Sequence, residues 1–193
     1  MSDFKKIKQA LFQLTPIPER EWNEFADNLV FKNFSKGDYL IREGQVEKFI
    51  YFLNKGSTRN YFIKDGKEFT VDFHFEGDFV TAYYSFITRE PSSVFIELLE
   101  ETEAIAIPYK LLHEFYNKYQ HGDRIGRLMA EAQYIKRLRK EMDLLSLTAE
   151  ERYAALMTKN PALISTISIK HLSSYLGIQP ESLSRIRKLY RKN

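Results

Sequence analysis

The strongest constraint on the fold is a helix–glycine–helix pattern in the last 26 residues of the chain. This stretch reads SIKHLSSYLGIQPESLSRIRKLYRKN, from Ser168 to Asn193. Apolar residues recur at helical spacing as far as Gly177, where the first helix is expected to end. Gln179 is expected to cap a second helix, and Pro180 then takes the first helical position, where a proline is best tolerated. We predict two short helices joined by a tight turn.

The second of these helices is cationic on its exposed sides. Its inward-facing side chains are expected to be Leu183, Ile186 and either Leu189 or Tyr190. From residue 182 onward the chain holds five basic residues and no acidic one. A helix-turn-helix with an exposed, positively charged second helix suits the major groove of DNA. The pattern therefore predicts double-stranded DNA as a partner.

The charge distribution assigns a polyanionic partner to this end of the chain alone. Residues 146–193 hold eight lysines and arginines against three acidic residues, a net charge of +5, whereas the rest of the chain carries −2. A basic segment on a nearly neutral body indicates that the segment itself binds nucleic acid.

The composition excludes several classes of site. The chain has no cysteine, so it holds no disulfide, no thiolate zinc site and no cysteine-bound iron–sulfur cluster. The first residues lack the apolar core of a secretory signal, and no apolar run reaches the roughly 18 residues that span a membrane. We therefore expect a cytoplasmic protein with no membrane partner and no cofactor.

Helices are predicted at the N-terminus and strands after them. Residues 3–29 are expected to form two helices that meet at Thr15-Pro16. The inward side chains of the second helix are expected to be Trp22, Phe25 and Leu29. Residues 31–107 show short aromatic and β-branched runs, with Asp65-Gly66 as a strong hairpin signal. Turn signals every seven to twelve residues predict an antiparallel barrel or double-sheet jelly roll with no helix inside it.

Helical spacing returns after Pro108 and continues into one long helix, from Asp123 to about Leu147. Apolar side chains recur along this helix every three or four residues, which is typical of a helix that packs on a partner. We interpret this stripe as a homodimer interface formed by Ile125, Leu128, Ala132, Ile135, Leu138, Met142 and Leu145. The alternative is that the helix lies across its own barrel. A capping box at residues 148–151 is expected to open the next helix.

A jelly roll, a long helix and a helix-turn-helix in this order resemble the cyclic-AMP receptor/fumarate-nitrate regulator (Crp/Fnr) superfamily of bacterial transcription factors. The resemblance covers almost the whole chain, and the order and spacing of its segments make it specific. The segments that carry it are Phe34–Gly44, Tyr51–Gly56, Glu76–Phe79, Glu151–Tyr153, Leu176–Ile178 and Glu181–Ile186.

The resemblance implies both a fold and a function. The fold is α+β, with a cyclic-nucleotide-binding-type sensor domain at residues 1–120, a dimerisation helix at 121–147 and an all-α DNA-binding domain at 148–193. The function is that of a transcriptional regulator which reads an inverted-repeat operator as a homodimer. RNA polymerase is then a further candidate partner.

The pocket of the sensor domain departs from the family pattern. Members that bind cyclic nucleotides hold the ribose with the glutamate of a Gly-Glu-Leu and the phosphate with an Arg-Ser or Arg-Thr. Here Thr81-Ala82-Tyr83 and Ser92-Ser93 stand at those places. A buried cyclic phosphate would therefore lack its charge-assisted bonds. We expect that cyclic AMP is not a tight ligand and that any small-molecule effector is of another kind.

Other pocket residues are candidates as well. Arg89 lies three residues before Ser92 and could replace the missing arginine. Tyr83, Tyr84 and Phe86 are expected to crowd or stack within the pocket. The predicted pocket as a whole comprises His74, Thr81, Ala82, Tyr83, Tyr84, Arg89, Ser92 and Ser93.

The family's base-reading glutamate and arginine match Glu181 and Arg185, which are four residues apart and so share one helix face. The glutamate can accept a hydrogen bond from a cytosine amino group, and the arginine can bond a guanine. Pro180 replaces a further arginine of the family, and the chain ends at Asn193, so we expect no β-hairpin wing. The predicted DNA contacts are Lys170, Gln179, Glu181, Ser182, Ser184, Arg185, Arg187, Lys188 and Arg191. Of these, the cations other than Arg185 are expected to meet phosphates, and Gln179, Ser182 and Ser184 could contact phosphates or bases.

Two alternatives belong to other function classes. A cupin-type metal enzyme needs two or three histidines and a carboxylate on neighbouring strands, whereas only His74 falls on a predicted strand. No serine or threonine has an evident histidine–carboxylate partner, so we expect no catalytic and no metal-binding residues. The second alternative is a protein-interaction module with a degenerate ligand-binding barrel, and the run of cations without exposed apolar anchors disfavours it.

Overall fold

The computed structural model describes residues 4–159, 161 and 166–190. The contacts between residues divide the chain into two compact units. The first unit is residues 1–62 with 72–131, and the second is residues 63–71 with 132–193. These boundaries cut the long helix and set apart the tip of a β-hairpin. The predicted domain limits at 120 and 147 therefore stay a prediction.

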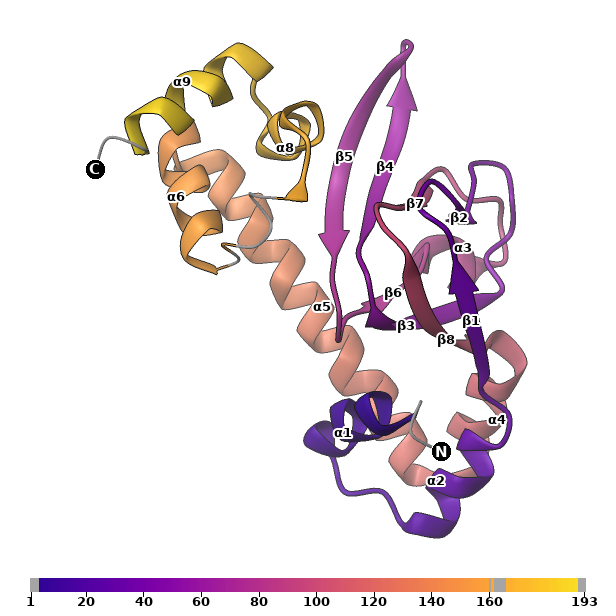
Figure 1. Cartoon of the computed structure of the whole chain (residues 1–193). Coiled ribbons are helices and arrows are strands. Elements are labelled where there is room, and N and C mark those ends of the chain that lie inside the picture. The colour runs from indigo at the N-terminus through magenta and orange to yellow at the C-terminus, as the bar shows by residue number, and fades with distance from the viewer. Residues whose placement is uncertain (1–3, 160, 162–165, 191–193) are drawn as a thin grey trace. The chain divides into compact units, whose positions relative to one another are not determined.

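Two four-stranded sheets form a jelly roll, with the orders β1-β8-β3-β6 and β2-β7-β4-β5 (Figure 1). Their bounds are β1 Val30–Phe34, β2 Tyr39–Ile41, β3 Phe49–Lys55, β4 Thr58–Lys64, β5 Lys67–His74, β6 Phe79–Val80, β7 Phe95–Leu98 and β8 Thr102–Pro108. Asp65 and Gly66 both have positive φ, as a two-residue hairpin turn between β4 and β5 requires. The predicted antiparallel double-sheet architecture and its hairpin are confirmed.

The first sheet is apolar on both faces because each face covers a different core. On β3, Tyr51 and Leu53 face the space between the sheets, whereas Ile50 and Phe52 join a second cluster with the N-terminal helices. The alanines and isoleucines of β8 at 104–107 alternate between the same two clusters. Strands buried on both faces lose the simple alternation of polar and apolar residues.

Helices flank the jelly roll in sequence, and one lies within it. Their bounds are α1 Lys5–Leu14, α2 Glu19–Ala26, α3 Tyr83–Thr88, α4 Tyr109–Lys118, α5 Gln120–Ser146, α6 Ala149–Lys159, α8 Ile169–Leu176 and α9 Pro180–Tyr190. The N-terminal pair splits as predicted, and Trp22 and Phe25 of α2 are buried. Leu29 is buried too, but it lies beyond the end of α2 at Ala26. The expectation of no helix inside the jelly roll is wrong. Six residues are too few for helical periodicity to show, and the aromatic composition of α3 imitates a strand.

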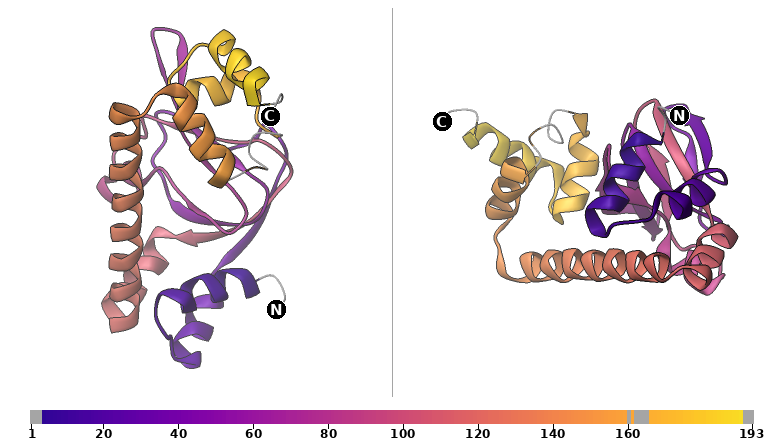
Figure 2. Two further views of the ribbon diagram at one scale, coloured as in Figure 1. Left: turned by 90° about the vertical axis from the view of Figure 1, so that its left-hand side faces the viewer. Right: turned by 90° about the horizontal axis from the view of Figure 1, so that it is seen from below.

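Helix α5 is one continuous helix in both views of Figure 2. Its first turns pack against α4 through two glycines. A Cβ on Gly122 would lie 2.6 Å from Cδ1 of Phe115, and one on Gly126 would lie 2.7 Å from Cζ of Tyr116. Only glycine allows this approach. Among the described residues, no helix is long and apolar enough to cross a membrane.

Two glycines with positive φ, of which only Gly56 in the turn between β3 and β4 has a close neighbour, separate the cost of backbone strain from the cost of overpacking. Gly56 has φ +101°, and a Cβ there would lie 2.8 Å from Cβ of Thr102. Gly37 has a similar φ of +87° but open space around its Cβ position. We expect Gly37→Ala to lower the free energy of unfolding by about 1–2 kcal/mol through backbone strain alone. Gly56→Ala should cost about 1–3 kcal/mol more through overpacking.

Urea denaturation of the two variants measures this difference. Equal destabilisation by both substitutions would show that the contact with Thr102 relaxes without cost.

Candidate nucleic-acid interface

The turn of the helix-turn-helix is fixed by backbone hydrogen bonds around Gly177. The Ser168 hydroxyl oxygen accepts from the His171 N–H at 3.2 Å and caps α8. At the other end Gly177 adopts the left-handed conformation, with φ +69°. Its N–H donates to the Ser174 carbonyl, and the Ile178 N–H donates to the Ser173 carbonyl. These two bonds form a Schellman motif, so the predicted helix end at Gly177 is confirmed.

Helix α9 turns its apolar face toward α8. Leu183 and Ile186 are buried in the second unit, as are Leu172 and Leu176 of α8. Pro180 is the first residue of α9, and the Gln179 carbonyl accepts the first helical N–H bonds, as the sequence predicts. Neither of the two candidates at the helix end is buried: Leu189 is 56% and Tyr190 44% exposed, although the Tyr190 ring contacts Tyr153 with 5.4 Å between ring centroids.

The predicted DNA contacts lie on the remaining faces of α9, at Gln179 just before it and at Lys170 on α8. Five of the predicted residues are exposed: Lys170, Gln179, Glu181, Arg185 and Lys188. Three are half-buried: Ser182, Ser184 and Arg187. The Ser184 hydroxyl donates to the Pro180 carbonyl at 3.0 Å, so it is turned back onto its own helix. Arg191 lies outside the described residues.

The charges of α9 match the electrostatics of a helix. Glu181 lies in the first turn, where the positive end of the helix dipole stabilises a carboxylate. Arg187 and Lys188 lie in the last turn, where cations are favoured. Glu181 and Arg185 are one helical turn apart and are both exposed. A guanidinium and a carboxylate thus project from the side of α9 that α8 does not cover.

Arg152 positions this motif, and no sequence signal pointed to it beyond the Glu151–Tyr153 resemblance. Its Nη1 donates to the Leu147 carbonyl at 2.5 Å, and its Nη2 donates to the Leu176 carbonyl at 2.9 Å. One guanidinium therefore joins the segment after α5 to the C-terminal end of α8. Arginine suits this task because its planar fork presents several donors at once.

The predicted capping box opens α6. The Thr148 N–H donates to the Glu151 carboxylate at 2.8 Å, and the Glu151 N–H donates to the Thr148 hydroxyl at 3.3 Å. The bonds from the Thr148 N–H and hydroxyl hold the pKa of the Glu151 carboxyl below its ordinary value. The prediction at residues 148–151 is confirmed.

The apolar stripe of α5 is exposed over most of its length. The exposed members are Ala132, Ile135, Leu138, Met142 and Leu145, and Leu128 is half-buried. The prediction that Ile125 belongs to the dimer interface is wrong, because it is 5% exposed and packs into the core of its own unit with Phe115. The helical period continues through Ile125, but its own unit already covers that residue.

Arg89, the candidate replacement for the missing phosphate-binding arginine, already contacts other groups of the chain. Arg89 ends α3 in the left-handed conformation, with φ +63°. Its Nη1 donates to the Glu47 carbonyl at 2.6 Å and to the Phe86 carbonyl at 3.2 Å. Its guanidinium carbon lies 4.2 Å from the centroid of the Tyr109 ring. Phe86 and Tyr109 belong to the cluster outside the jelly roll, so Arg89 is engaged there.

Glu47 anchors both ends of α3 to the start of β3, and no sequence signal pointed to it. Its Oε1 accepts from the N–H groups of Lys48 and Phe49 at 2.9 and 3.1 Å, and its Oε2 accepts from the Ala82 N–H at 3.4 Å. The main-chain N–H of Glu47 donates to the Ser85 hydroxyl at 3.0 Å. A buried carboxylate thus takes the amide at the beginning of α3.

The three aromatic residues expected to crowd the pocket do not enter it. Tyr83 and Tyr84 are 56% and 64% exposed, and Phe86 is buried in the cluster outside the jelly roll. The prediction that these rings fill the pocket is therefore wrong. The short helix turns them away, because residues on one helical turn cannot all face the same side.

The small polar residues of the predicted pocket bond to the backbone. The Thr81 hydroxyl donates to the Phe49 carbonyl at 2.9 Å, and the Ser92 hydroxyl donates to the Val94 carbonyl at 2.9 Å. Ser93 is exposed, whereas Ala82 and His74 are buried. The hydroxyls of Thr81 and Ser92 are thus both engaged at main-chain carbonyls, and the predicted pocket stays a prediction.

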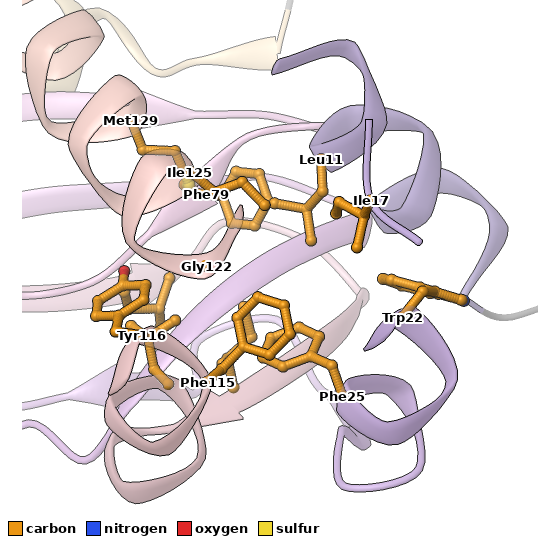
Figure 3. Close-up of a pocket in the computed structure, with 13 residues that line it drawn as sticks. Leu11, Ile17, Trp22, Phe25, Phe79, Phe115, Tyr116, Gly122, Ile125 and Met129 are labelled. Atoms are coloured by element: carbon orange, nitrogen blue, oxygen red, sulfur yellow. The ribbon is translucent and has the colours of Figure 1, made fainter. Parts of the chain in front are cut away.

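A cavity of the first unit lies elsewhere, between the N-terminal helices, the first sheet and the start of α5 (Figure 3). Leu11, Trp22, Phe115, Tyr116 and Met129 are among the residues that line it. None of the predicted pocket residues does so. Its lining carries no charged side chain, and Tyr116 supplies a hydroxyl at one end. Burial raises the pKa of that hydroxyl to about 12.

Comparison with known proteins supplies the family. The profile described as "Cyclic nucleotide-binding domain" matches residues 31–119. The chain is 25% identical to the fumarate and nitrate reduction regulatory protein of Yersinia pestis, over 86% of this chain and 72% of that protein. It is 27% identical to the transcriptional activator protein Anr of Pseudomonas aeruginosa, over 82% and 69%. FixK2 from Bradyrhizobium japonicum shares the fold, with a TM-score of 0.70 and 20% identity over 85% of each chain.

The chain belongs to the Crp/Fnr superfamily of transcriptional regulators. The chain is therefore a DNA-binding transcriptional regulator. The relatives are named as regulators and activators, which does not favour the alternative of a protein-interaction module. In the described ranges, no cluster of three histidines, aspartates or glutamates could hold a metal ion.

The Glu47 anchor of this Crp/Fnr chain should be visible as a pH dependence of stability. Burial raises the pKa of the Glu47 carboxyl above its ordinary value of 4.5, against the opposing effect of its N–H donors. The folded state therefore binds this proton more tightly than the unfolded chain does. The resulting stabilisation is fully present below pH 4.5 and is lost as pH rises through the raised pKa.

Denaturant titrations of the wild type and Glu47→Gln at several pH values measure this contribution. The unfolding free energy of the wild type, relative to the variant, is expected to fall as pH rises. A difference that stays constant with pH would contradict the prediction.

Proposed function

We propose that this regulator is a homodimer that reads an inverted-repeat operator and is not controlled by cyclic AMP. The observation that carries the proposal is the placement of Glu181 and Arg185 on the exposed side of α9, opposite buried Leu183 and Ile186. Arg185 bonds a guanine and Glu181 accepts from a cytosine amino group in the major groove. The exposed lysines Lys170 and Lys188 contact phosphates and fix the register.

The dimer forms through the exposed stripe of α5. Ile135, Leu138, Met142 and Leu145 are spaced three or four residues apart, which is the spacing that a parallel partner helix buries. Ile125 is left out of the interface because it packs within its own unit. A two-fold axis along this stripe presents two copies of α9 about one turn of the duplex apart.

Cyclic AMP is not a tight ligand because its two anchoring groups are absent and Arg89 is engaged at main-chain carbonyls. The Glu47 carboxylate adds to this, since it would repel a phosphate near the beginning of α3. An effector, if the regulator has one, is a small molecule of other chemistry. The protein acts in the cytoplasm, where the chromosome and RNA polymerase are its further partners.

Base reading and phosphate contact make different predictions for two residues of α9. Arg185→Ala is expected to cost about 1–3 kcal/mol at one symmetric base position of the operator and little on random DNA. Lys188→Ala should weaken binding to all sequences alike and flatten the salt dependence of affinity.

Selection of duplexes from a random pool, followed by fluorescence anisotropy on the selected operator and on random DNA, separates the two. Equal loss from Arg185→Ala on both duplexes would refute the base-reading role.

The dimer interface can be tested with two leucines of equal exposure. Leu138 lies on the stripe and Leu144 lies off it, and both are 45% exposed. Leu138→Glu should convert the dimer to a monomer and lower affinity for the inverted repeat at least tenfold, because a buried unpaired carboxylate is costly. Leu144→Glu makes the same change in charge and volume and should leave the dimer intact. Sedimentation velocity distinguishes the species, and a monomeric wild type would overturn the proposal.

A further inference from the structure

Strand β5 carries a contact that the DNA-reading role does not explain. It is the last strand in the order β2-β7-β4-β5, so within the described part of the chain no further strand pairs with its outer edge. Within the second unit, the hydroxyl of Ser174 on α8 donates to the Glu68 carbonyl at 3.1 Å and accepts from the Thr70 N–H at 2.9 Å. One side chain thus imitates the two backbone bonds that a neighbouring strand would make.

Strand β5 also forms an ion pair with Lys170, one of the predicted DNA contacts. The carboxylate of Glu68 lies 3.2 Å from Nζ of Lys170, the exposed lysine in the first turn of α8. Strand β5 therefore contacts α8 through the Glu68 side chain at Lys170 and through two backbone groups at Ser174. The ammonium that would meet a DNA phosphate is instead held by a carboxylate.

A third contact joins the strand to the long helix. Nζ of Lys140 on α5 donates to the Val71 carbonyl and lies 3.8 Å from the ring centroid of Tyr175 on α8. Strand β5, α5 and α8 therefore meet around two lysines and one serine, all within the second unit.

We propose that the tip of β5 is an autoinhibitory latch on the helix-turn-helix. The inference rests on the proposed DNA-reading function and adds its regulation. When the latch is closed, Glu68 neutralises Lys170 and holds a carboxylate where a DNA phosphate would approach α8. DNA binding then requires the strand edge to leave α8, which costs the Ser174 bonds and the ion pair. Opening the latch is a population shift, so weakening its contacts raises the apparent affinity for every duplex.

The latch is tested by two substitutions that open it in different ways. Glu68→Gln removes the ion pair with Lys170 but keeps the carbonyl that Ser174 bonds. Ser174→Ala removes both backbone bonds but keeps the ion pair. Each is expected to tighten DNA binding about fivefold, the lower end of ordinary coupling between sites. Anisotropy of the full chain on the selected operator and on a random duplex measures the change, which should be the same on both.

Each substitution has a matched control. Glu76→Gln makes the same charge change at an exposed glutamate that pairs with Lys6 in the first unit. Ser146→Ala removes a hydroxyl that bonds only within its own helix, at the Met142 carbonyl. Glu76→Gln should change DNA affinity only by the general effect of removing one negative charge, and Ser146→Ala should leave the affinity unchanged. In a Lys170→Ala background the gain from Glu68→Gln should largely vanish, because its target is gone.

The outcomes separate this inference from the proposed function. If the wild type binds DNA and Arg185→Ala loses base preference, but Glu68→Gln and Ser174→Ala leave affinity unchanged or weaker, the latch is refuted and DNA reading stands. If Glu76→Gln tightens binding as much as Glu68→Gln, the gain is net charge and the latch is also refuted. If none of the proteins binds any duplex at low salt, both proposals fall.

Discussion

Burial of the apolar seam between α8 and α9 determines where the charged side chains of α9 point. Leu172 and Leu176 on one helix, with Leu183 and Ile186 on the other, are removed from water within the second unit. Each such burial stabilises by about 1.5–3 kcal/mol, which far exceeds the effect of any exposed charge. A helix that buries residues 183 and 186 must turn residue 185 outward. The left-handed turn at Gly177 sets the crossing that lets the two faces meet.

Features with a local or periodic signal could be predicted from the sequence. The hairpin at Asp65-Gly66, the capping box at 148–151 and the turn at Gly177 each depend on residues only a few positions apart, and each is confirmed. The fold class followed from the order of such signals. The two-sheet core followed less directly, since strands covered on both faces lose their alternation.

What the sequence could not supply are contacts between side chains and distant backbone groups. Glu47 bonds the amide of Ala82, and Ser174 bonds the amide of Thr70, 104 positions away. Serine and glutamate are common, so neither residue stands out before the chain folds. Ile125 illustrates a related limit. Its spacing continues the stripe of α5, but periodicity shows only that a face is covered and never by what.

The contacts of Glu47 and Arg89 limit how the connection between α3 and β3 can be altered. The Glu47 carboxylate accepts from three amides at once, those of Lys48, Phe49 and Ala82, so removing it would leave all three without that acceptor. Arg89 donates to the main-chain carbonyls of Glu47 and Phe86, so turning its guanidinium toward a new group would break both bonds. An exchange at either position therefore loosens the end of a helix before it creates any new binding group.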